Sequence, residues 1–197
     1  MASVTGRLIA VDARRYVGKG YVFGGDASSP GIWDCSSYVS YVLGHDLRLA
    51  LPGGRWNGPG MPPHAHGPVV MDYVNWTGAR PVTAPEAGDL CCWAGLGADG
   101  HIGIAVNSSE MVSALNPGLG VAVTPIVGTG PSNVPLVYRR ITGLAGGTGL
   151  PSIAAPSGAK SPPAAIVVFA VAAGLVLVGA MLIIPAGTAL IARRVIS

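Results

Sequence analysis

Charged residues are scarce in this 197-residue chain: Lys, Arg, Asp and Glu together make up 11% of it, and the net charge is +3. The few basic residues are scattered rather than gathered into a run that could follow a phosphate backbone. A charge this small gives little attraction for nucleic acid, so we expect no nucleic-acid partner. The length fits one domain of about 100–150 residues with an additional segment.

Cysteine is also rare, and its number is odd. The three cysteines are Cys35, Cys91 and Cys92. An odd count argues against a disulfide framework, and adjacent cysteines rarely pair with each other. At least one free thiol is therefore expected, and a single Cys with a distant His is the pattern that makes a catalytic thiol a candidate.

The amino-terminal end lacks the pattern of a secretory signal. Its only early apolar run is Leu8 to Val11, and Asp12, Arg14 and Arg15 follow immediately. A signal peptide needs a longer apolar stretch after its basic residues. We therefore expect no amino-terminal signal peptide.

The opposite end is strongly apolar, because residues 164–192 contain no charged residue. About 20 apolar residues suffice to span a bilayer as a helix. A buried core helix is the alternative, but a helix that is apolar on all faces has no place in so small a domain. The expected organisation is a domain at 1–142, a flexible Gly/Pro/Ser-rich linker at 143–163, a transmembrane helix at 164–192 and a basic tail at 193–197.

The first domain shows helical periodicity followed by strand periodicity. Helices are expected near residues 9–17, over 35–43 with Asp34 as N-cap and Gly44 as C-cap, and near 69–76. From Gly88 onward apolar residues alternate, which predicts strands separated by short turns. The order indicates an α+β fold in which helices pack on an antiparallel meander. The expected strands are 90–93, 101–106, 110–115, 121–126 and 134–141.

Cys35 lies in the first turn of the second predicted helix. Unpaired backbone N–H groups and the helix dipole at such a position favour a thiolate, and can lower a thiol pKa from about 8.5 into the range of about 3.5–7.5. The same N–H groups could bind the oxyanion of a tetrahedral intermediate. The alternative is a small buried hydrophobic residue, since Cys35 shares its helical face with Tyr38 and Val39.

His101 opens a predicted strand, and its side chain shares a face with Gly103 and Ala105. Because both are small, this face should leave room for another element, such as the start of a helix. An ordinary surface His at a turn is the alternative. Taken together, Cys35 and His101 would form a Cys–His pair, the minimum for an activated thiol.

Four short blocks surround these two residues in a fixed order, and in this combination the sequence resembles the NlpC-type cell-wall peptidases. These are papain-like cysteine hydrolases of peptidoglycan stem peptides. The resemblance covers roughly residues 5–142, and it implies a Cys-bearing helix packed on a small antiparallel sheet that carries the His. The blocks are Tyr21-Val22-Phe23-Gly24-Gly25, Asp34-Cys35-Ser36-Ser37, Gly88-Asp89-Leu90 and Gly100-His101-Ile102-Gly103-Ile104.

The resemblance also implies roles for single residues. Cys35 would be the nucleophile and His101 the base. In the family a third polar residue on the next strand orients the His. Ser113 occupies the matching position here and can accept a hydrogen bond from imidazole, whereas Asn116 could take the role if the strand ends early. The residues placed near the oxyanion or the substrate are Tyr21, Asp34 and Ser36.

Other side chains could in principle bind a metal ion. His64 and His66 form a His-x-His in a Pro-rich loop, but no carboxylate or Cys is near them in the sequence, which favours a solvated loop. Cys91 and Cys92 alternate on a predicted strand, so that one of them should face the core. We expect neither a metal nor a cofactor.

These features predict a peptidoglycan hydrolase that cleaves amide bonds of stem peptides by a Cys–His thiol mechanism and contacts a membrane through its carboxyl-terminal helix. The absence of a leader pattern and the Gly/Pro-rich insert at 45–87 suggest a phage tail-associated lysin, located in the virion tail beside other tail proteins. A membrane-anchored hydrolase facing the cell wall is the alternative setting. The alternative function is a catalytically silent peptidoglycan-binding module or structural tail component.

Overall fold

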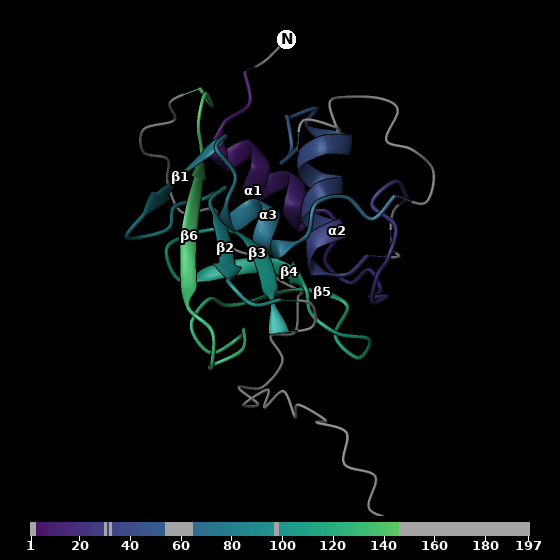
Figure 1. The fold of residues 1–197 in the computed structure, drawn as a ribbon. Coiled ribbons are helices and arrows are strands. Elements are labelled where there is room, and N and C mark those ends of the chain that lie inside the picture. The colour runs from purple at the N-terminus through teal and green to yellow at the C-terminus, as the bar shows by residue number, and fades with distance from the viewer. Residues whose placement is uncertain (1–2, 30, 32, 54–64, 97–98, 146–197) are drawn as a thin grey trace, which may run out of the picture. The chain divides into compact units, whose positions relative to one another are not determined.

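Helices come first in the chain and strands follow, as expected for an α+β fold (Figure 1). The computed structural model describes residues 3–29, 31, 33–53, 65–96 and 99–145. Within these residues the helices are α1 (Gly6–Arg14), α2 (Cys35–Ser40), the π-helix η1 (Tyr41–Asp46) and α3 (Val70–Val74). The strands are β1 (Ala79–Val82), β2 (Leu90–Trp93), β3 (His101–Ala105), β4 (Glu110–Ala114), β5 (Val121–Pro125) and β6 (Leu136–Ile141).

The strands form one antiparallel sheet in the order β1-β6-β2-β3-β4-β5. The predicted meander is confirmed for β2 to β5. It is wrong for β6, which returns to pair with β2 rather than β5 and so makes β2 an interior strand. The edge strand β1 was not predicted, because Arg80 and Pro81 break any apolar alternation. Proline is tolerated at a sheet edge, where its missing N–H costs no ladder bond.

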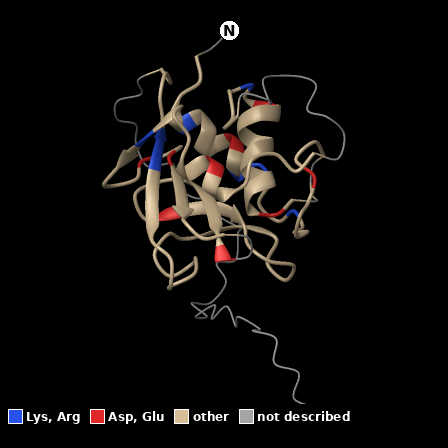
Figure 2. Ribbon diagram, viewed as in Figure 1, with Lys and Arg blue, Asp and Glu red and all other residues tan. Residues whose placement is uncertain are grey.

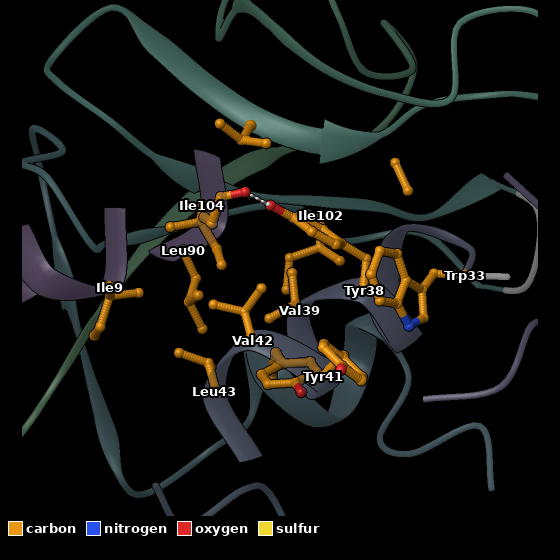
Figure 3. Packing of buried hydrophobic residues seen from close by; sticks show 14 of the residues in the cluster. Ile9, Trp33, Tyr38, Val39, Tyr41, Val42, Leu43, Leu90, Ile102 and Ile104 are labelled. Atoms are coloured by element: carbon orange, nitrogen blue, oxygen red, sulfur yellow. Dashed lines mark hydrogen bonds between the residues drawn. The ribbon is translucent and has the colours of Figure 1, made fainter. Parts of the chain in front are cut away.

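Both faces of the sheet are covered, each by its own apolar cluster. The larger cluster lies between the helices and the sheet, where Ile9, Val39 and Val42 pack with Ile102 and Ile104 (Figure 3). The smaller cluster lies on the other face and contains Cys91, Trp93, Ala105, Met111 and Ile126.

The two faces explain the adjacent cysteines. Cys92 belongs to the larger cluster and Cys91 to the smaller one, and both are fully buried. The sequence predicted that one of them faces the core, and in the structure each faces a core of its own. Strands buried on both faces lose the polar alternation that marks a half-exposed strand.

The helix that begins at Cys35 does not stop at Gly44 as predicted. Instead α2 changes into η1 at Tyr41 and continues through Gly44 to Asp46. The residues from Tyr41 to Gly44 are all buried, and the hydroxyl of Tyr16 donates a 2.5 Å hydrogen bond to the carboxylate of Asp46. Tertiary packing therefore carries the helix past a residue that usually ends one.

Charged residues are dispersed over the described part of the chain (Figure 2). The adjacent Arg139 and Arg140 lie on β6, where Arg140 forms ion pairs with Asp89 and Glu86. Among the helices of the described residues, none is long and apolar enough to cross a membrane. The predicted linker, apart from residues 143–145, and the whole predicted transmembrane helix lie outside those residues, so both stay predictions.

Candidate active site

The start of α2 is shaped by the side chain of Asp34. Its Oδ1 accepts hydrogen bonds from the backbone N–H groups of Ser36 (3.0 Å) and Ser37 (2.9 Å), and the Ser37 hydroxyl accepts one from the N–H of Asp34 (2.8 Å). The Ser36 hydroxyl also bonds to Oδ1 (3.1 Å). This reciprocal cap makes Cys35 the first residue of the helix. The polar groups of Asp34 and Ser36 thus serve to position Cys35.

Cys35 itself lies partly buried where α2 packs on the beginning of β3. Its thiol interacts with the backbone of Ile102, the residue that follows His101, and with the backbone of Ser36. The nucleophile and the base expected from the sequence are therefore brought to the same end of β3.

The pKa of Cys35 is raised to about 12, contrary to the lowered pKa expected from its position. Burial is the main cause, and the negative charge of Asp34 adds to it. The nearby backbone groups favour the thiolate but do not outweigh these two effects. The resting thiol is therefore protonated at neutral pH.

His101 is buried on β3 and is held by Ser113 on β4. Its Nε2 lies 3.0 Å from the Ser113 Oγ, and that hydroxyl donates to the backbone carbonyl of Ile102 at 2.6 Å. Because the hydroxyl proton goes to Ile102, the oxygen must accept from Nε2–H. This fixes the tautomer and leaves Nδ1 with a free lone pair. Burial lowers the pKa of His101 to about 4, so that the imidazole is neutral at rest.

Of the two residues considered for orienting the imidazole, only Ser113 reaches it. Asn116 lies in the turn between β4 and β5, where its Oδ1 accepts hydrogen bonds from the N–H groups of Gly118 (2.9 Å) and Leu119 (3.0 Å). The strand therefore does not end early enough for Asn116 to face His101. Ser113 is the candidate that the geometry supports.

The small residues beside His101 serve a different purpose from the one expected. A Cβ built on Gly103 would lie 2.5 Å from the sulfur of Met111, so the space is filled by β4 and not by a helix. On the same face the ring of Trp93 lies 5.5 Å from that of His101. The helices pack against the face of β3 that carries Ile102 and Ile104, and the Cys35 thiol reaches the start of this strand through the backbone of Ile102.

Tyr21 lies close enough to Cys35 and Asp34 to interact with both electrostatically. Tyr21 forms an isolated parallel β-bridge with Trp33, and the N–H of Val22 donates to the Trp33 carbonyl at 2.8 Å. Burial raises the pKa of Tyr21 to about 12, and electrostatic interactions with Cys35 and Asp34 add to the effect. Its hydroxyl therefore remains a hydrogen-bond donor at all physiological pH values.

His66 is a residue of this site that the sequence did not reveal. Its Nε2 lies 2.7 Å from Oδ2 of Asp34, although the two residues are 32 positions apart. The sequence favoured a solvated loop because no carboxylate is near His66 along the chain. The described residues contain no group of three or more His, Cys, Asp or Glu side chains that could hold a metal ion, and His64 lies outside them.

Known proteins are similar to this chain in sequence. Residues 18–140 match the model of the NlpC/P60 family. Protein P54 of Enterococcus faecium is 30% identical over 121 residues, a match that covers 61% of this chain but only 20% of P54. The chain thus spans about a fifth of the length of that relative.

Two solved structures are similar to part of this chain. The NlpC/p60 domain of the peptidoglycan hydrolase SagA is 26% identical, with a TM-score of 0.46 over 68% of this chain and 97% of that chain. A hypothetical invasion protein of Mycobacterium tuberculosis is 24% identical, with a TM-score of 0.48 over 72% of this chain and 66% of that chain. The family match takes in more than half of the chain, so the chain belongs to the NlpC/P60 family and carries its α+β, papain-like domain.

Proposed function

We propose that the protein is a cysteine peptidase that hydrolyses amide bonds in the stem peptides of peptidoglycan. Members of the NlpC/P60 family are cysteine peptidases that act on peptidoglycan, and this membership supplies the substrate class. The observation that carries the proposal is the oriented imidazole of His101. Ser113 fixes its tautomer, and the Cys35 thiol lies at the same end of β3.

The reaction follows from the two protonation states. Nδ1 of His101 takes the thiol proton as the Cys35 sulfur forms a bond to the peptide carbonyl carbon. The resulting imidazolium then gives that proton to the amine nitrogen as the C–N bond breaks. Water, deprotonated by His101, attacks the thioester and releases the acid and the thiol.

The two pKa values indicate when the proton moves. Because the pKa of Cys35 is raised and that of His101 is lowered, the resting pair is neutral. The proton is therefore transferred during the attack and not before it. Two donors are available to support the negative carbonyl oxygen that forms: the backbone N–H of Cys35, which does not bond to the Asp34 carboxylate, and the hydroxyl of Tyr21.

The test is the release of new amino groups from purified peptidoglycan. The full-length protein is incubated with insoluble cell walls, and soluble products are analysed by mass spectrometry and amine labelling. The proposal expects stem-peptide fragments with new amino and carboxyl ends. Binding to the walls without any released fragment would instead support a catalytically silent peptidoglycan-binding module.

We also propose that the domain works beside a membrane, tethered through residues 164–192. The support is the 29-residue stretch without charge, long enough to span a bilayer. The full-length chain is expected to float with lipid vesicles in a density gradient, whereas a chain ending at residue 163 stays in the dense fraction. Equal behaviour of both chains would contradict the tether. Detection of the protein in purified virions would favour the tail-associated setting over a cellular one.

A further inference from the structure

The carboxylate of Asp34 joins three segments of the active site. Its Oδ1 caps α2 by accepting from Ser36 and Ser37. Its Oδ2 accepts from the backbone N–H of Gly24 at 3.1 Å and from Nε2 of His66 at 2.7 Å. The side chain of Asp34 is only 8% exposed and that of His66 is 29% exposed, so the carboxylate end of this ion pair is shielded from water. His66 therefore acts on the same group that positions both the nucleophile and the turn that carries Tyr21.

Both ring nitrogens of His66 face hydrogen-bond acceptors. Nε2 faces the Asp34 carboxylate, and Nδ1 lies 3.2 Å from the carbonyl oxygen of Gly67. A neutral imidazole carries one N–H and could satisfy only one of these acceptors, whereas the imidazolium donates to both. The bonded carboxylate raises the pKa of His66, in agreement with this geometry. In return, the hydrogen bond from His66 contributes to lowering the pKa of Asp34 to about 2.

The charge of Asp34 shifts the pKa values of the groups proposed to react. The negative charge of Asp34 raises the pKa of Cys35 and of Tyr21, and it also raises that of His101 against the effect of burial. Within the part of the chain that the structure describes, these three groups and His66 interact electrostatically with the carboxylate. A positive charge bonded to Asp34 weakens its field at the thiol, and removing that charge would make the thiolate harder to form.

We propose that His66, as an imidazolium bonded to Asp34, is a positioning residue of the active site: it holds segment 65–67 against the start of α2 and offsets the carboxylate charge beside Cys35. The effect on turnover rests on the proposed function, but the effect on the thiol does not. The pair is intact below the ordinary His pKa of about 6.5 and is lost as pH rises through the raised pKa of His66. Above the pKa of His66, the alkylation rate of Cys35 should therefore rise with pH less steeply than that of an ordinary thiol.

The first experiment measures the rate at which iodoacetamide alkylates Cys35 in the full-length protein between pH 6 and 9. Cys35→Ala provides the background, since Cys91 and Cys92 are buried. His66→Gln, which keeps a donor but not the charge, should lower the rate at pH 7 by about 10-fold. His66→Arg keeps a charge that does not titrate, and should restore the rate to within about threefold.

A matched control is available in His45. Its Nδ1 lies 3.0 Å from Asp46 in η1, so it forms a His–Asp contact outside the site, and His45→Gln should leave the rate unchanged. An unchanged rate in His66→Gln, or an equal loss in His66→Gln and His66→Arg, would overturn the proposal. In the latter case His66 would act by shape and not by charge.

A second measurement does not depend on catalytic activity. The imidazole of His66 is titrated by NMR in the wild-type protein and assigned by its absence in His66→Gln. A midpoint above about 6.5 is expected, and a midpoint at or below that value overturns the proposal. If cell walls are not degraded but both thiol and NMR results hold, the proposed function fails and the role of His66 stands. If wild type and His66→Gln degrade walls equally well, the proposed function stands and the role of His66 fails.

Discussion

Replacing Cys35 with alanine is expected to reduce amine release from peptidoglycan by at least about 10³-fold, to the background of the assay. The thiol is the nucleophile in the proposed reaction, and no acyl-enzyme can form without it. Cys35→Ser should be almost as inactive. A serine hydroxyl is far harder to deprotonate than a thiol, and His101 is a weak base in its buried site. The initial rate of amine release from purified walls measures both losses.

Cys91→Ala is the matched control for this experiment. Its thiol lies on β2 in the cluster on the face away from the helices, and burial raises its pKa to about 12. Its removal should keep activity within about threefold and lower the free energy of unfolding by about 1 kcal/mol. Residual activity of one tenth or more in Cys35→Ala would mean that another residue attacks the substrate.

The positions of Cys35 at a helix start and of His101 at a strand start could be predicted because short local patterns determine both. Asp34 before Cys35 forms a cap whose bonds span three residues, and His101 opens a strand whose alternation is visible in the sequence. Such local signals survive folding almost unchanged. The α+β order and the strands β2 to β5 were predictable for the same reason.

The contacts that cross the chain could not be predicted in this way. His66 meets Asp34 from a Pro-rich stretch without periodicity, so nothing near it in the sequence indicated a partner. The pairing of β6 with β2 likewise depends on the whole sheet. Local pattern gives no information about long-range partners of this kind.

The thiol pKa shows how a correct local prediction can give the wrong electrostatics. The sequence correctly placed Cys35 at the start of a helix, where backbone N–H groups favour a thiolate. It did not show how deeply the thiol is enclosed, nor that the capping carboxylate of Asp34 remains charged beside it. Burial is a property of the tertiary structure, and here it outweighs the local effect.

Replacing His101 with glutamine is expected to lower kcat/KM for wall cleavage by about 10³-fold, because a general base contributes about 10²–10⁴. Glutamine has similar volume and can still bond to Ser113, but it cannot accept the thiol proton. In the wild type the base must be unprotonated. Since burial lowers the pKa of His101 to about 4, activity should persist below pH 6 and fall only as pH approaches about 4. A pH profile of kcat/KM measures this fall in activity at acid pH.

Two further variants separate the orientation of the base from its chemistry. Ser113→Ala removes the acceptor for Nε2–H but keeps the imidazole, so it should cost about 10-fold in kcat/KM, less than His101→Gln. Asn116→Ala removes only turn hydrogen bonds and should keep activity within about twofold. Equal activity of Ser113→Ala and wild type would mean that packing against Trp93 alone orients the ring. A fall of wild-type kcat/KM with a midpoint near pH 6.5 would instead show that the imidazole is hydrated in solution. The proposal that Cys35 and His101 are both neutral at rest would then be wrong.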